Sequence, residues 1–324
     1  MIPLLVTSAY PATANTFAAT RARAALAAGE IPGFTATTDP AVAQAILFFE
    51  HHPDSDPFFL SVLRHPLVRR YPRKCLLSHD ADFVVPAMSG FYPSLTRDQF
   101  RTDRFESWVY LNQQCPNPEI RFVPATGHER HLFSFVGAVR THPVRSRLMA
   151  LPGPGAYLED TSGANAWQLT DSQRHIHHLQ YARRLADSLF VLCPRGVGPN
   201  SYRVGEAMQT GRVPVIISDE FPPPPALPWA DFAVFVAEAE VESIPQRLAA
   251  MTSRAVAMGN VARAVWERHY RWPSGFAQLC AQVPRLVAAG PTRFPFLRAL
   301  SLVCRSSGYA RLFVRSLRAR RAVQ

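Results

Sequence analysis

The sequence predicts an α/β protein in which parallel sheets are flanked by helices. Apolar runs of strand length alternate with segments of helical spacing, and the helical segment 16–29 ends at a glycine. Polar residues cluster directly after two of the apolar runs, and open α/β sheets bind ligands at the carboxyl ends of their strands. With 324 residues, the chain is long enough for two domains of this kind.

The first half carries strand signals at residues 1–10, 41–50 and 74–78, and helix signals at 16–29 and 57–71. Residues 86–124 contain many prolines without a clear period, and we expect them to be the end of the first domain and a linker. In the second half, strands are expected at 132–138, 189–192, 213–217 and 232–236, and helices at 173–187, 202–210, 241–251 and 252–269.

Composition narrows the class of protein. No apolar run reaches 18 residues, so no transmembrane helix is expected, and the start lacks the basic region of a signal peptide. Five scattered cysteines include no CxxC pair, so neither disulfides nor a zinc site is expected, and a cytoplasmic setting fits best. The net charge of +11 resides in the last part of the chain, where residues 268–324 contain eleven arginines and no acidic residue.

The segment 189–219 is the most informative of the chain. A strand is followed by a glycine-containing turn at 193–201, then a helical segment that stops at Gly211, then a second strand. Backbone N–H groups, a helix start and an arginine all favour an anion such as a nucleotide diphosphate. Arg195 and Arg203 suit phosphate oxygens, and Glu206 is placed to accept hydrogen bonds from a ribose or sugar hydroxyl. The alternative is a structural turn with an Arg–Glu surface pair.

The run SLFVLCPRGVGPNSYRVGEAMQTGRVPVIISD, with Trp229 before the next strand, resembles the exostosin family, glycosyltransferase family 47. The matching parts are the CPRG-like turn, a Ser-x-Arg-x-x-Glu-Ala helix that starts at Ser201, and a Gly-x-x-Pro-Val strand. Upstream, FSFVGAVR resembles the Phe-x-Gly-x-x-Arg strand of the family. The resemblance covers residues 132–250.

This resemblance implies a GT-B architecture, with two Rossmann-like domains, a cleft between them and a C-terminal helical segment. The expected parts are an acceptor domain at 1–125, a donor domain at 126–285 and a basic helical tail at 286–324. It further implies an inverting transfer from a nucleotide-diphosphate sugar to a hydroxyl of a saccharide or lipid-linked saccharide, with no metal and no other cofactor. The donor-binding residues it points to are Arg140, Arg195, Gly196, Ser201, Arg203 and Glu206.

Inversion requires a base that deprotonates the acceptor hydroxyl, and in this fold it usually comes from the first domain. Asp80 and Asp82 are the first choice, because the apolar residues that follow them could raise the pKa of a carboxylate. His51 belongs to the second candidate cluster. The structural alternative is that the aspartates cap a turn. Arg145 could also reach a diphosphate, whereas the histidines at 175, 177 and 178 are expected to lie on a surface or a partly buried face.

The basic tail leaves two functions open. Residues 305–321 mix arginine with apolar residues at helical intervals, as a helix on an anionic membrane surface would. Residues 275–300, which precede this tail, are expected to form a helix that packs on the first domain. The tail thus suits an enzyme peripheral to the inner membrane face, and no nucleic-acid partner is expected. The alternative function is a non-catalytic nucleotide-binding or membrane-surface scaffold.

Overall fold

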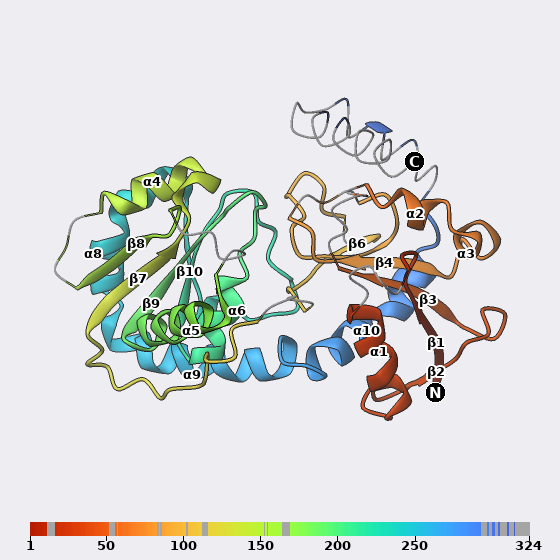
Figure 1. Ribbon diagram of the computed structural model, residues 1–324, viewed down its shortest axis with the longest axis horizontal. Coiled ribbons are helices and arrows are strands. Elements are labelled where there is room, and N and C mark those ends of the chain that lie inside the picture. The colour runs from red at the N-terminus through yellow and green to blue at the C-terminus, as the bar shows by residue number, and fades with distance from the viewer. Residues whose placement is uncertain are drawn as a thin grey trace. The chain divides into compact units, whose positions relative to one another are not determined.

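The computed structural model divides the chain into two compact units, and the first of them is discontinuous. The first unit comprises Met1–Gln114 and Trp272–Gln324, and the second comprises Cys115–Arg271. The structure describes residues 1–11, 17–51, 56, 58–82, 84, 86–101, 103–111, 116–151, 153, 155–163, 169–292 and the single positions 297, 300, 301, 304, 310 and 314. Each unit is a parallel sheet flanked by helices (Figure 1).

The first unit is built on a six-stranded sheet with the order β2-β1-β3-β4-β5-β6. Its strands are β1 (Ile2–Thr7), β2 (Phe34–Ala36), β3 (Ala45–Glu50), β4 (Cys75–His79), β5 (Gly90–Tyr92) and β6 (Phe105–Ser107). All neighbouring pairs are parallel. Every residue of β3 and β4 is buried, as expected for strands that are covered on both faces.

Successive residues of β3 point to opposite faces of the sheet and contact different helices. Phe48 lies 5.1 Å from the ring of His65, which begins the short helix α3 (Pro66–Arg70) after α2 (Leu60–Leu63). The next residue, Phe49, lies 5.2 Å from Phe276 of α10 (Ser274–Ala288). The helix α1 (Phe17–Ala27) packs on β1 and β3. The first core is therefore completed by a helix from the far end of the chain.

The second unit contains a five-stranded sheet with the order β11-β10-β9-β7-β8. The strands are β7 (His131–Gly137), β8 (Ala156–Asp160), β9 (Ser188–Pro194), β10 (Val213–Ile217) and β11 (Val234–Val236), and all pairs are parallel. If the five strands are renumbered 1 to 5 along the chain and read from the β8 edge, their order is 2-1-3-4-5. The first five strands of the first unit have the same order. Both are doubly wound α/β sheets.

Helices cover both faces of the second sheet. Figure 1 shows α5 (Asp171–Ala186), α6 (Arg203–Thr210) and α9 (Thr252–His269) on one face, and α4 (Pro143–Met149) and α8 (Ile244–Ala249) on the other. The remaining elements are the short helix α7 (Trp229–Phe232) and the 3-10 turns η1 (Val139–Thr141) and η3 (Glu238–Ser243). Gly211 ends α6 with φ of 83°, and a Cβ there would lie 2.7 Å from the ring of Phe122. Only glycine fits this position.

Several expectations differ from the structure. The segment 86–124 was expected to end the first domain without regular structure, but it contains the strands β5 and β6, which extend the first sheet. The expected helix at 57–71 is broken into α2 and α3, since Pro66 starts a new helix. The expected domain boundaries were 125/126 and 285/286, whereas contacts divide the chain at 114/115 and 271/272. Packing of the later helix on the first unit is confirmed for α10.

Two expectations about membranes have different outcomes. None of the described helices combines the length and the apolar character that are needed to cross a bilayer. The amphipathic tail expected at 305–321 lies outside the described residues, apart from positions 310 and 314.

Candidate functional site

The second unit contains a pocket at the point where its strand order reverses. The chain leaves β7 towards β8 on one side and continues to β9 on the other, so the carboxyl ends of β7 and β9 diverge. The pocket has a volume of about 300 Å³. It is lined by Asn117, Val136, Gly137, Thr161, Leu169, Arg174, His177, His178, Tyr181, Tyr202, Arg203 and Glu206. This is the place where open α/β sheets take their ligands.

Arg203 lies at the floor of the pocket and is fixed from the end of β7. Its Nε donates to the backbone carbonyl of Val136 at 3.0 Å, and its guanidinium carbon lies 5.4 Å from the centroid of the Phe135 ring. Gly137 makes room for it, because a Cβ at that position would lie 2.2 Å from Nη2. Within the described part of the chain, the guanidinium makes hydrogen bonds only through Nε. The two Nη groups remain for a ligand.

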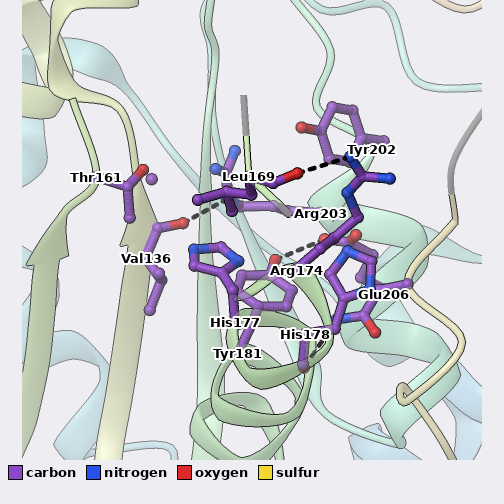
Figure 2. A pocket seen from close by; sticks show the side chains of 12 residues that line it. Val136, Thr161, Leu169, Arg174, His177, His178, Tyr181, Tyr202, Arg203 and Glu206 are labelled. Atoms are coloured by element: carbon purple, nitrogen blue, oxygen red, sulfur yellow. Dashed lines mark hydrogen bonds between the residues drawn. The ribbon is translucent and has the colours of Figure 1, made fainter. Parts of the chain in front are cut away.

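Glu206 lies three residues further along α6 and is tied to α5. The hydroxyl of Tyr181 donates to Oε2 of Glu206 at 2.5 Å (Figure 2). Burial raises the pKa of Glu206, while the Tyr181 hydrogen bond and the positive charge of Arg203 act in the opposite direction. The pKa of Tyr181 is raised well above its usual value by burial and by the neighbouring carboxylate. The pair is thus held rigidly at one side of the pocket.

One face of α5 supplies the rest of that wall. Arg174, His177, His178 and Tyr181 are spaced i, i+3, i+4 and i+7, so they share one face of the helix, and all four line the pocket. The helix starts with a capping box in which Thr170 and Gln173 exchange hydrogen bonds. Burial lowers the pKa of His178, and the nearby His177 and Arg174 lower it further. His177 and His178, which were expected on a surface or a partly buried face, are half-buried and line the pocket.

Arg195, predicted to bind the diphosphate, lies outside the pocket lining. Its Nη1 lies 2.8 Å from a carboxylate oxygen of Glu220 and 3.4 Å from one of Glu238. These two acids compensate its charge, which sequence spacing does not reveal because they follow 25 and 43 residues later. The Arg195 side chain is therefore engaged in ion pairs within the second unit.

The CPRG-like turn is shaped by Arg145, which is 5% exposed. It donates to the carbonyls of Arg195, Ala138 and Pro194 at 2.8, 2.9 and 3.2 Å. A Cβ on Gly196 would lie 3.0 Å from Nη2 of Arg145, so this glycine allows the close approach. The donor-binding role predicted for Gly196 stays a prediction, whereas Arg145 joins the turn to the end of β7.

Ser201 and Arg140 lie beside the pocket and do not line it. Ser201 is buried, and its Oγ accepts from the backbone N–H of Arg203 at 3.4 Å, so it helps to begin α6. Arg140 is exposed, and its Nη1 donates to the carbonyl of Ser162 at 3.4 Å. Ser201 thus orients the helix that carries Arg203 and Glu206.

In the first unit, the predicted catalytic His51 follows a buried carboxylate at the corresponding reversal point between β1 and β3. Glu50 is 1% exposed, and its two oxygens accept from Ser8 Oγ at 2.7 Å and from the N–H of Ala9 at 2.8 Å. Burial raises the pKa of Glu50 to about 7, although both hydrogen bonds lower it. The half-buried ring of His51 lies 5.0 Å from that of Phe17.

The predicted bases Asp80 and Asp82 follow β4, one strand further out. Asp82 is exposed and accepts a hydrogen bond from the hydroxyl of Tyr110 at 3.0 Å. Asp80 is half-buried and acts electrostatically on Arg21. Of the apolar residues that were expected to surround them, Val84 is buried, and the other two, at 83 and 85, lie outside the described residues.

The class defined by this geometry is a two-unit, doubly wound α/β protein with a pocket at the reversal point of its second sheet. Within that class, residues 123–251 match the model of the Exostosin GT47 domain. The resemblance to the exostosin family is therefore confirmed for the segment that carries the pocket residues Arg203 and Glu206.

Curated relatives share the same segment. The chain is 34% identical over 116 residues to "Exostosin-1 homolog" of Caenorhabditis elegans, which covers 33% of this chain and 30% of the relative. It is 36% identical over 98 residues to "Probable beta-1,4-xylosyltransferase IRX10" of Arabidopsis thaliana, covering 28% and 24%. With the "Probable glucuronoxylan glucuronosyltransferase IRX7" of the same plant it shares 27% over 199 residues, covering 59% and 41%. The chain thus spans less than half the length of these relatives.

Solved structures give distant likenesses. "WaaG, a glycosyltransferase involved in lipopolysaccharide biosynthesis" aligns with a TM-score of 0.41 and 11% identity, over 87% of this chain and 99% of the other. Anabaena Alr3699/HepE in complex with UDP aligns with a TM-score of 0.38 and 12% identity, over 74% and 72%. The two parallel sheets of the chain itself establish the fold class.

Proposed function

We propose that the chain is an inverting glycosyltransferase that uses a nucleotide-diphosphate sugar and acts on a saccharide hydroxyl. The observation that carries this proposal is that Arg203 and Glu206 line one pocket at the carboxyl ends of β7 and β9, inside the segment that matches the Exostosin GT47 domain. The names of several curated relatives contain xylosyltransferase or glucuronosyltransferase, which supports the same reaction class.

In the proposed donor complex, Arg203 binds the diphosphate and Glu206 accepts from a hydroxyl of the ribose or the sugar. When the acceptor oxygen attacks the anomeric carbon, the bond to the diphosphate breaks and its electron pair passes to the leaving oxygen. The guanidinium and the dipole at the start of α6 stabilise that growing charge. The proposal therefore assigns this task to side chain and backbone and includes no metal or other cofactor.

The proton of the acceptor hydroxyl passes to a base of the first unit, for which Asp80, Asp82 and His51 are the candidates. The substitutions Asp80→Asn, Asp82→Asn and His51→Gln separate them. The base variant should lose turnover by roughly 100-fold or more while the affinity for the donor stays unchanged. If all three variants keep full turnover, the base lies elsewhere.

Calorimetric titration with UDP, GDP and ADP, followed by transfer assays with the matching sugar nucleotides, tests the reaction class. Arg203→Ala and Glu206→Gln should weaken nucleotide binding by roughly tenfold or more, whereas the exposed Arg183→Ala on α5 serves as control. Unchanged binding in Arg203→Ala would remove the site assignment. If the wild type binds none of the nucleotides, the reaction class is wrong.

The cellular setting belongs to the same proposal: a cytoplasmic enzyme held at an anionic membrane surface by the arginines at 305–321. Cosedimentation with vesicles of phosphatidylglycerol, compared with neutral phosphatidylcholine, tests it. Binding that is equal for both lipids, or absent for both, would refute the electrostatic attachment.

A further inference from the structure

The helix α5 contributes Arg174 and His177 to the pocket that Arg203 also lines. Figure 2 shows Arg174 and His177 directed towards the space that Arg203 also faces. All three are half-buried, so they combine access for a ligand with partial removal from water. The attraction between a half-buried polar or charged group and an anion is stronger than that of a fully exposed group, because the dielectric constant around the half-buried group is lower.

Arg174 lacks a strong acidic partner in the described part of the fold. The carboxylate that pairs with Arg174 is that of Asp171 at 3.7 Å, which is fully exposed and contributes little. The Arg174 guanidinium donates through Nη2 to the carbonyl of Leu169 at 3.2 Å. Among the residues that the structure describes, the imidazole of His177 makes no hydrogen bond. Both groups therefore retain donors for a ligand.

The one carboxylate in the pocket lining balances at most one of the two guanidinium charges there. Glu206 is buried, its pKa is raised by burial, and its Oε2 already accepts from Tyr181. Arg174 and Arg203 share the lining with this single acid, and His177 and His178 add imidazole groups that can donate hydrogen bonds to phosphate oxygens. A single phosphate can reach the donors of one helix, whereas a diphosphate has enough oxygens to accept from Arg203 on α6 and also from Arg174 and His177 on α5.

We propose that Arg174 and His177 are ligands of the donor diphosphate, so that the two phosphates are held between α5 and the start of α6. The inference rests on the proposed function, since it assigns further binding residues to the same site. Such a clamp would favour a diphosphate over a monophosphate with the same base, because the second phosphate is needed to reach both helices.

A pair of histidines on α5 provides a matched test. His177→Gln removes a pocket group, whereas His175→Gln removes an exposed imidazole of the same helix that lies 3.7 Å from Glu119 and outside the pocket. Affinities for UDP and UMP are measured by calorimetry on the full chain, with thermal unfolding as a check of folding. Arg174→Lys is a third variant that keeps the charge and loses the planar fork.

His177→Gln should weaken UDP binding by roughly tenfold and UMP binding by less, while His175→Gln stays within about twofold of the wild type. Arg174→Lys should weaken UDP binding as well. If Arg203→Ala loses UDP binding while His177→Gln and Arg174→Lys both keep wild-type affinity for UDP, this inference is overturned and the proposed function survives. If the wild type binds neither UDP nor another nucleoside diphosphate, both are overturned.

Discussion

Glu50 allows a quantitative prediction about stability, because a buried carboxyl with a raised pKa couples folding to pH. Replacement by glutamine keeps the shape and removes the titration. The amide oxygen of the new side chain can still accept from the N–H of Ala9, and its NH2 group can donate to Oγ of Ser8. The Glu50→Gln variant therefore changes the charge while it preserves both contacts with the end of β1.

The size and the sign of the pH dependence of stability follow from the raised pKa of Glu50. The pKa of Glu50 rises from the usual 4.5 to about 7 in the folded protein, so the native state binds the proton more strongly than the unfolded state. The resulting stabilisation is complete below pH 4.5 and is lost as the pH rises through 7. At ~1.4 kcal/mol for each tenfold change in affinity, the wild type should lose about 3 kcal/mol of unfolding free energy over this window.

Hydrogen exchange of the β1 and β3 amides at pH 5 and pH 8, corrected for the chemical exchange rate, reports on the first unit alone. Between these two values, Glu50→Gln should abolish most of the wild-type decrease in protection, and at pH 8 it should be the more stable form. Glu30→Gln, at an exposed position of the same unit, should follow the wild type. If Glu50→Gln shows the same pH dependence as the wild type, burial of this carboxyl does not govern it.

Three further predictions concern the second unit. Gly137→Ala places a Cβ 2.2 Å from Nη2 of Arg203 and should weaken UDP binding by roughly tenfold in calorimetry, unlike Gly163→Ala, whose Cβ meets no atom of the described residues within 4 Å. Tyr181→Phe removes the donor to Glu206 and raises the pKa of that acid further, so the pH of half-maximal transfer should move upward; an unchanged profile would show that Glu206 need not ionise. Arg212→Met leaves the carbonyls of Val123 and Ala186 without their 2.7 Å donors and should cost about 3 kcal/mol or more in urea unfolding, against little for exposed Arg183→Met.

The fold was predictable where the hydrophobic period was long or the stop signal was strong. The strand at 213–217 and the helix at 252–269 have the predicted bounds, and Gly211 ends α6 as expected. The three-residue strands β5 and β6 escaped prediction because they carry too few residues for a period. Their place in the sheet is decided by pairing with β4, which is a tertiary contact.

The site was predictable only in part. The spacing of Arg203 and Glu206 placed them correctly on one helix. The ion pairs of Arg195 with Glu220 and Glu238 could not be predicted, because these partners lie far along the chain. The i, i+3, i+4, i+7 spacing of polar and aromatic residues on α5 was the available signal for the opposite wall. It could not be used alone, since the same spacing is typical of a solvated helix face.

The discontinuity of the first unit has a consequence for the order in which the protein can fold during synthesis. The ribosome completes all of the second unit, up to Arg271, before it adds the helix that covers Phe49 through Phe276. The part of the chain that is made first must therefore wait for the part that is made later, and one apolar surface of its sheet stays uncovered in the meantime. Domains commonly finish folding in the order of translation, but here the domain that is begun second can be finished first.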